Sequence, residues 1–237
     1  MKTLVVIPAY NEAGKIRMTL ERHLKERPYD LAIINDGTTD GSLDGLDETF
    51  NVKIVSHETT RGVGAAERTM IRYAQARGYE VIVFMAGNDK DRPDEISRLL
   101  SPIEADKADF VQGSRYLPGG RFGRMPFYRQ LATRFVHPWL FSLLVGRRFT
   151  DTTNGFRAIS ISLLRDQRID LDQRWLDHYE LEPYLFYKAV KLGYKVIEVP
   201  VSKTYPPKEL GYSKMKPITG WWSILRPLVL LAFGMKK

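Results

Sequence analysis

Short apolar runs alternate with helix-forming segments along the first hundred residues of the chain. Four runs with the composition of buried strands lie at residues 3–7, 31–34, 52–55 and 81–85. Helical patterns follow the first, third and fourth runs. Strands that alternate with helices are joined by right-handed crossovers, which place helices on both faces of a parallel sheet. The sequence therefore predicts an α/β fold with a mostly parallel sheet.

The second half of the chain continues this pattern with longer polar interruptions. Further strands are expected at residues 109–112 and 195–201, and helical segments at residues 128–145 and 179–192. The polar, glycine-bearing residues 150–158 predict a loop with Arg157 at its end. Residues 205–217 carry prolines and lysines and predict a basic loop.

The composition is that of a globular protein that attracts anions. Of 237 residues, 43% are hydrophobic and 27% charged, and the formal net charge is +8. A positive surface favours nucleic acid, anionic lipid, or nucleotide and sugar phosphates. No nucleic-acid-binding motif accompanies the basic residues, so we expect no nucleic-acid partner. A membrane surface or a phosphorylated substrate remains, and the alternative is a solvated basic face.

Cysteine content and the N-terminal pattern concern the compartment. The chain has no cysteine, which excludes disulfides and thiolate metal sites and fits a reducing compartment. No signal-peptide pattern follows Met1. We therefore expect a cytoplasmic protein.

The fourth apolar run ends in an acidic turn, residues 86–91, with the sequence AGNDKD. Ligands of open α/β sheets bind beyond the carboxyl ends of the strands, so carboxylates and a lysine here are placed for a phosphate or a metal. An alternative interpretation is that Asp91 and Asp94 cap the helix that follows. Residues 61–65 contain Gly-x-Gly, but they lack the further residues of a dinucleotide or P-loop motif, and close helix packing explains the glycines equally well.

The apolar residues 218–233 predict a final helix. A membrane-spanning helix needs about 20 apolar residues, whereas Arg226 and Pro227 interrupt this shorter run. Trp221, Trp222 and Leu225, with lysines nearby, suit a helix lying on an anionic bilayer. The alternative is a helix packed on the domain or in a dimer.

Six motifs occur in order along nearly the whole chain. They are VVIPAYNE at residues 5–12, INDGTTDGS at 34–42, RGVGAA at 61–66, the acidic turn with Pro93, GSRY at 113–116 and TNGFRA at 153–158. Together they resemble the inverting glycosyltransferases of the GT-A fold, and most of all the dolichyl-phosphate mannose synthase group. The resemblance implies a Rossmann-like GT-A catalytic domain over residues 1–204, followed by a basic loop and a membrane-facing amphipathic helix over residues 205–237.

The resemblance also implies an activity and residue roles. We expect transfer of a sugar, with inversion, from a nucleotide-diphosphate donor to a membrane-held acceptor, a polyprenyl phosphate, at the inner face of the membrane. Arg115 would lie near the transferred group, and Asp36 would hydrogen-bond the base. The residues expected to bind the nucleotide are Pro8, Ala9, Tyr10, Asn11, Glu12, Asp36, Gly62 and Gly64. The residues expected to bind the acceptor phosphate are Arg129, Thr133 and Arg157.

The chain departs from this family at the acidic turn. The family usually has Asp-x-Asp directly after the fourth strand, where it binds a divalent ion that bridges the donor's diphosphate, and Ala86 and Asn88 occupy those positions here. Either Asp89 and Asp91, with Asn88 as a further ligand, form a shifted site for magnesium or manganese, or Lys90 supplies the positive charge instead. A third interpretation is that the transferase activity is lost.

Two alternative functions remain open. The first is transfer to a soluble or glycan hydroxyl acceptor, with Asp151, Glu180 or Glu182 as the base. The second is nucleotide binding without catalysis.

Overall fold

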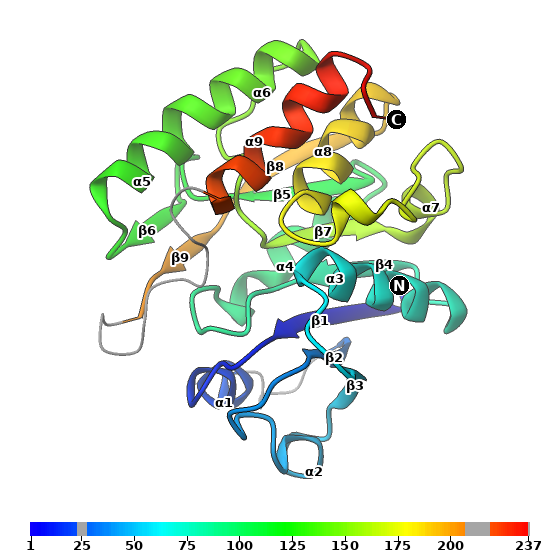
Figure 1. The fold of residues 1–237 in the computed structure, drawn as a ribbon, viewed down its shortest axis with the longest axis vertical. Helices are drawn as coiled ribbons and strands as arrows, with labels where there is room; N and C mark the ends of the chain where they lie inside the picture. Colours follow the sequence, from blue (N-terminus) through cyan, green and yellow to red (C-terminus); the bar gives the residue numbers. More distant parts are fainter. Residues whose placement is uncertain (23–27, 207–218, 237) are drawn as a thin grey trace.

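A seven-stranded sheet forms the centre of the computed structural model, which describes residues 1–22, 28–206 and 219–236 (Figure 1). The strand order is β3-β2-β1-β4-β7-β5-β8. The strands are β1 (Thr3–Ala9), β2 (Asp30–Asp36), β3 (Lys53–His57), β4 (Val81–Phe84), β5 (Phe110–Ser114), β7 (Arg157–Ser160) and β8 (Val196–Pro200). All neighbours pair in parallel except β7, which runs antiparallel to β4 and β5. The predicted mostly parallel sheet is confirmed.

The prediction of a loop over residues 150–158 is wrong at its C-terminal end. Arg157 and Ala158 begin β7, which inserts between β4 and β5. The strand is short, and its two partners lie far away in sequence. Hydrophobic periodicity within one segment cannot report such pairing, although Ala158 and Ile159 are fully buried by it.

Helices cover both faces of the sheet and enclose two hydrophobic cores. Alternate residues of β1 show the division, because Leu4 and Val6 face one core while Val5 and Ile7 face the other. The second core is closed by α1 (Lys15–Glu21), α2 (Leu46–Phe50) and α4 (Ile96–Glu104). The first core is closed by α3 (Val63–Ala76), α6 (His137–Val145), α7 (Ile161–Leu164), α8 (Leu181–Lys191) and α9 (Thr219–Ala232).

The predicted helix over residues 128–145 is one continuous helical segment. It consists of α5 (Phe127–Leu131), a π-helical stretch (Ala132–Val136) and α6. Short 3-10 turns occur at Pro93–Glu95 and Arg174–Leu176. A separate two-stranded sheet pairs β6 (Arg121–Gly123) with β9 (Ser202–Thr204).

The final helix, α9, packs on the domain beside α6 and α8 (Figure 1). Leu228 and Leu231 belong to the first core. This supports the packed-helix alternative, while Trp222 on the same helix stays exposed. Most of the predicted basic loop, residues 207–217, lies outside the described residues. In the described parts of the chain, no helix combines the length and the apolar content needed to cross a bilayer.

Candidate active site

A cleft of about 390 Å³ opens at the carboxyl ends of β1, β2 and β4. Parallel strands end at one edge of a sheet, so the loops that follow them converge there. The predicted residues that line the cleft are Pro8, Ala9, Tyr10, Glu12, Asp36, Gly62 and Asn88. Residues that sequence analysis did not single out also line it, among them Thr60, Glu67, His178 and Tyr179. The cleft thus gathers most of the residues expected to bind a nucleotide.

Asp36 is the organising carboxylate at the base of this cleft. It is buried, and its two oxygens accept hydrogen bonds from the main-chain N–H groups of Arg61 and Gly62 at 2.9 and 2.8 Å. The ring nitrogen Nδ1 of His57 lies 2.8 Å from Asp36 Oδ1. Asp36 therefore fixes the loop before α3, and sequence analysis missed the contribution of His57.

Two other predicted nucleotide-binding residues have structural partners. Asn11 Oδ1 accepts a hydrogen bond from Thr39 N at 2.8 Å, which ties the loop after β1 to the loop after β2. A Cβ atom on Gly64 would overlap the carbonyl oxygens of Leu176 and His178. Gly64 does not line the cleft, so close packing of α3 explains this glycine.

The acidic turn sends its two carboxylates in different directions. Asp91 is buried, and its oxygens accept hydrogen bonds from Lys203 Nζ at 2.6 Å and Ala86 N at 2.9 Å. Asp89 has a φ of 59° and pairs with Arg22 Nη2 at 3.0 Å. The structure therefore does not bring the two predicted metal ligands together. The capping interpretation is also wrong, because Arg92 is the N-cap residue and no side chain caps this turn.

Asp89 and Lys90 line a second, strongly basic pocket of about 310 Å³. Asn88, the residue before them, lines the cleft and not this pocket. The remaining residues that line the second pocket are Lys15, Met18, Arg22, Arg92, Arg124, Thr204, Tyr205 and Pro206. The turn therefore separates a nucleotide-sized cleft from a cationic pocket.

The residues of the turn do not fit a divalent cation. The cleft side presents Ala86, Gly87 and Asn88, so its one side-chain ligand is a neutral amide, whose buried Oδ1 accepts no hydrogen bond from a described residue. Magnesium sites in such enzymes use one or two carboxylates with the substrate phosphates. No group of three or more His, Cys, Asp or Glu residues in the described chain is arranged to hold a metal ion. The two carboxylates of the predicted metal site are therefore not available together on the cleft side of the turn.

Lys90 is buried beside several of these basic side chains. Its ammonium lies 4.5 Å from the centroid of the Tyr205 ring. Burial, and then the positive charges of Lys203 and Arg129, lower the pKa of Lys90 to about 7 against the opposing effect of the Glu12 and Asp91 carboxylates. Lys90 thus lies in a region of positive potential.

Glu67 and Glu182 line the cleft, and the guanidinium of Arg157 lies close to them. Arg157 Nη2 lies 3.3 Å from Glu182 Oε1. Burial, and then the charge of Glu182, raise the pKa of Glu67 well above its ordinary value, against the opposing effect of Arg157. The spacing from Met70 and Ala74 places Glu67 on the buried face of α3, and this spacing could have drawn attention to it.

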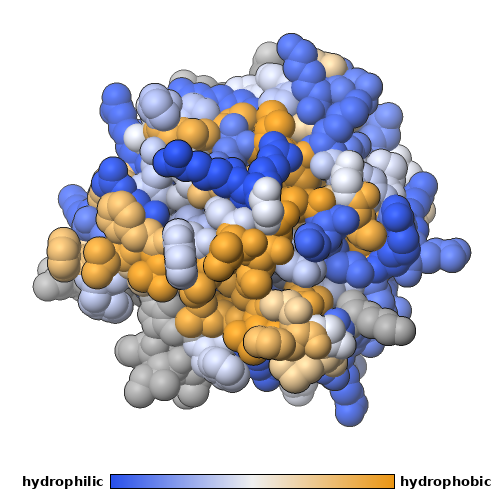
Figure 2. All heavy atoms as spheres, turned by 90° about the horizontal axis from the view of Figure 1, so that it is seen from above, coloured by the Kyte–Doolittle hydropathy of each residue, from blue (hydrophilic) through white to orange (hydrophobic). Residues whose placement is uncertain are grey.

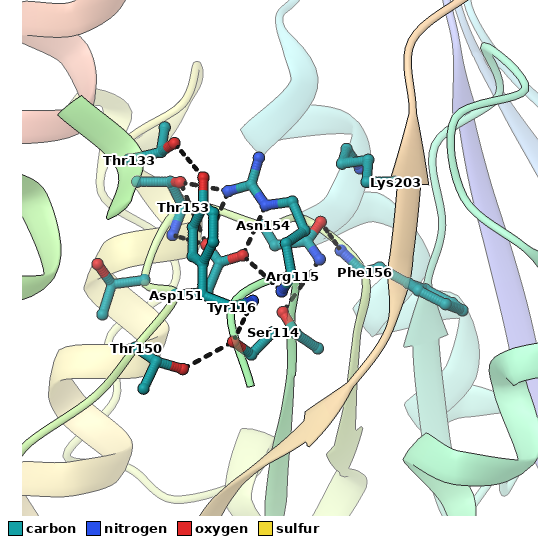
Figure 3. A network of polar contacts seen from close by, with 12 residues as sticks. Ser114, Arg115, Tyr116, Thr133, Thr150, Asp151, Thr153, Asn154, Phe156 and Lys203 are labelled. Carbon is teal, nitrogen blue, oxygen red and sulfur yellow. Dashed lines mark hydrogen bonds and ion pairs between the residues drawn. The ribbon is translucent and has the colours of Figure 1, made fainter. Parts of the chain in front are cut away.

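Arg115 is held in a buried ion pair rather than in the cleft (Figure 3). Its Nε and Nη2 atoms donate to the two oxygens of Asp151 at 2.6 and 2.7 Å, and Nη2 also donates to Thr153 Oγ1. Burial alone would lower the pKa of Arg115, but the charge and hydrogen bonds of Asp151 raise it above its usual range. The pair joins the loop after β5 to the loop before β7.

The three candidate bases differ in their access to the cleft. Asp151 is fully buried in the pair with Arg115. Glu180 is buried and pairs with Arg226 of α9 at 3.4 Å. Glu182 alone of the three lines the cleft.

The residues expected to bind the acceptor phosphate form two groups. Arg129 and Thr133 lie one helical turn apart. The hydroxyl groups of Thr133 and Tyr116 form a hydrogen bond of 2.6 Å. Arg129 Nη1 donates to Tyr205 OH at 3.4 Å, which brings it next to Lys90. Arg157 lies apart from them, on β7 with Glu182.

The chain is similar to enzymes that act on polyprenol carriers. It is 33% identical over 224 residues to an undecaprenyl-phosphate mannosyltransferase of Micrococcus luteus, covering 91% of this chain and 88% of the relative. It is 32% identical over 220 residues to a polyprenol monophosphomannose synthase of Mycolicibacterium smegmatis, covering 90% and 81% of the two chains.

Solved structures confirm the fold. Glucosyl-3-phosphoglycerate synthase of Mycobacterium tuberculosis, crystallised with Mn²⁺, UDP-glucose and phosphoglyceric acid, superposes with a TM-score of 0.64 at 18% identity, covering 96% of this chain and 80% of that one. The GT-A architecture is therefore shared. The model of the family "Glycosyl transferase family 2" matches residues 4–168. The chain belongs to glycosyl transferase family 2.

Proposed function

We propose that this glycosyltransferase moves a sugar, with inversion, from a nucleotide-diphosphate donor to a polyprenyl phosphate at a membrane surface. The observation that carries the proposal is the similarity, at 33% and 32% identity over most of the chain, to two enzymes named for polyprenol carriers. The position of the cleft at the carboxyl ends of the strands supports the same reading.

The cleft supports a nucleotide-diphosphate sugar as the donor. Pro8 and Ala9 end β1 and Tyr10 follows it, so they offer main chain and an aromatic ring to a nucleoside. Asp36 lines the same region and retains one lone pair, on Oδ2, for a base N–H. The wall with Glu67 and Glu182 offers carboxyl groups to sugar hydroxyls. The donor would thus extend from β2 towards the acidic turn.

The chemistry of a phosphate acceptor suits this site. A phosphate oxygen of the acceptor attacks the anomeric carbon, the bond from that carbon to the donor's diphosphate oxygen breaks, and the nucleoside diphosphate leaves with the electron pair. A phosphate monoester is already anionic, so the step needs no strong base. Arg129 is placed to orient such a phosphate. A hydroxyl acceptor would need a carboxylate base, but Asp151 pairs with Arg115 and Glu180 pairs with Arg226. This also favours the phosphate acceptor.

The proposed location is the inner face of the membrane, and an apolar face of the molecule supports peripheral contact with a membrane. The segment from α5 to α6 exposes apolar side chains at about one per helical turn, and α9 adds others beside it. Figure 2 looks onto this side of the molecule and shows a band of apolar atoms across it. The exposed apolar residues are Phe127, Tyr128, Leu131, Phe135, Val136, Trp139, Leu143, Trp222, Val229, Phe233 and Met235. Arg134, Arg147 and Arg148 are exposed nearby for anionic headgroups.

The test compares acceptors. Vesicles containing undecaprenyl phosphate, undecaprenol or no polyprenol are incubated with the protein and radiolabelled UDP- and GDP-sugars, and the label in the organic extract is counted. We expect labelled lipid with undecaprenyl phosphate alone. Label that appears in undecaprenol would favour the hydroxyl acceptor. Label that appears in a soluble glycan, and is lost in Glu182→Gln, would favour it as well. Nucleotide binding without any transfer would favour the binding protein.

No step of this proposal is assigned to a metal. The sequence predicts either magnesium or manganese at Asp89 and Asp91 or Lys90 in place of the metal, and the solved neighbour was crystallised with Mn²⁺ and UDP-glucose. In this chain those carboxylates contact Arg22 and Lys203 instead.

A further inference from the structure

The donor's diphosphate needs positive charge near it as it departs. The two carboxylates of the acidic turn are not placed to hold a metal ion that would supply this charge. Asp91 has both oxygens engaged by Lys203 and Ala86, and Asp89 pairs with Arg22. Charge that develops in a transition state is best stabilised by groups that are already in place. The basic side chains around the turn are the candidates.

Around Lys90, three basic side chains, those of Lys203, Arg129 and Lys15, outnumber two acidic ones, those of Glu12 and Asp91. The ammonium of Lys90 senses Lys203, Arg129, Glu12 and Asp91. Lys15 pairs with Glu12 at 3.1 Å and lines the basic pocket with Lys90. The cluster therefore holds a surplus of basic groups. Glu12 lines the donor cleft, so the cluster borders the donor site.

The turn is held rigidly from both sides. Thr204 N donates to the carbonyl oxygen of Lys90 at 2.9 Å, and Asp89 N donates to Thr19 Oγ1 at 3.0 Å. The Asp91–Lys203 pair fixes the far end of the turn to β9. The Tyr205 ring lies under the Lys90 ammonium. Lys90 is thus held in one position on the wall of the basic pocket, near Glu12 of the cleft.

We propose that Lys90 binds the diphosphate of the donor in place of a divalent metal ion, with the charges of Lys203 and Arg129 adding to the positive potential around it. The inference rests on the proposed function, because it assigns a role within the same donor site. Lys90 contacts the phosphate oxygens, and the Asp91–Lys203 pair positions Lys90. A purely structural Lys90, packed on Tyr205, would leave affinity for the diphosphate unaffected.

The test measures nucleotide binding rather than turnover. Isothermal titration calorimetry with UDP, GDP, CDP and ADP, and with the corresponding nucleosides, is run in EDTA and again with Mn²⁺. The variants are Lys90→Met, which keeps the apolar stem, and Lys90→Arg, which keeps the charge. Lys195→Met is the matched control, since Lys195 pairs with Asp106 in an exposed position before β8.

We expect the preferred nucleoside diphosphate to bind within twofold of the same affinity in EDTA and in Mn²⁺. Lys90→Met should weaken that binding at least tenfold and leave nucleoside affinity within twofold, whereas Lys90→Arg and Lys195→Met should bind nearly as wild type. Two results would overturn this inference and leave the proposed function standing. One is a wild type whose nucleoside diphosphate affinity is at least tenfold higher with Mn²⁺ than in EDTA. The other is a folded Lys90→Met variant with normal diphosphate affinity. If no nucleoside diphosphate binds under either condition, the proposed function fails with it.

Discussion

The ammonium of Lys203 lies 2.6 Å from Asp91 Oδ1, and both side chains are buried. Removing one member of such a pair leaves the other charge buried without a counter-charge, at a cost of about 3–5 kcal/mol. We therefore expect Asp91→Asn to lower the free energy of unfolding by about that amount, measured by urea denaturation. Asp91→Asn combined with Lys203→Met should recover at least half of the loss.

The control for this prediction is a solvent-exposed ion pair. Asp106 and Lys195 are 3.0 Å apart and both largely exposed. Asp106→Asn should cost less than about 1 kcal/mol. Equal losses at Asp91 and Asp106 would contradict the structural role given to the buried pair.

Asp36 is expected to matter for the fold as well as for the nucleotide. Its two oxygens accept hydrogen bonds from the main-chain N–H groups of Arg61 and Gly62. In Asp36→Asn, the side-chain NH₂ group would face one of these N–H groups, and that hydrogen bond would be lost. We expect Asp36→Asn to lower the free energy of unfolding by about 1.5–3 kcal/mol and also to weaken nucleoside diphosphate binding. Unchanged stability would show that the loop before α3 does not depend on this carboxylate.

His137 should make stability depend on pH in the acid range. Its ring nitrogens lie 2.7 Å from Thr152 Oγ1 and 3.4 Å from the carbonyl oxygen of Ile224, and burial lowers the pKa of His137 to about 4. The unfolded chain, with a histidine pKa near 6.5, binds the proton more readily. Stability contributed by neutral His137 is therefore fully present above pH 6.5 and is lost as the pH falls towards 4, on the order of 3 kcal/mol in total.

The measurement for His137 is the slope of unfolding free energy against pH. His137→Gln removes the titrating group, so its slope between pH 6.5 and pH 4 should be shallower than that of the wild type. Parallel curves for the two proteins would mean that His137 is protonated equally in the folded and unfolded states.

The apolar face should control attachment to membranes. Trp139 and Leu143 are 66% and 67% exposed, so replacing both by alanine should leave folding stability nearly unchanged. Burial of such a side chain in a bilayer is worth about 1.5–3 kcal/mol, so the double variant should bind anionic vesicles at least tenfold more weakly in a sedimentation assay. Met18→Ala, an exposed apolar residue on α1, is the control and should bind as wild type. Equal loss in both variants would place the membrane contact elsewhere.

The sequence is most informative where structure follows from one segment. The strands of the first half are continuous apolar runs, so β1 to β4 and the cleft at their carboxyl ends could be predicted. The strand β7 could not, because four residues acquire their meaning from two distant partners. The same limit applies to the acidic turn, where the partner of Asp91 lies 112 residues away on β9.

The measurement that tests the central claim most directly is the identity of the lipid product. Undecaprenyl phosphate recovered after incubation with the preferred nucleotide sugar should gain the mass of one glycosyl residue, and NMR should show that residue on the phosphate with the anomeric configuration inverted relative to the donor. An unchanged lipid mass while the donor is consumed, or a product with retained configuration, would contradict the account.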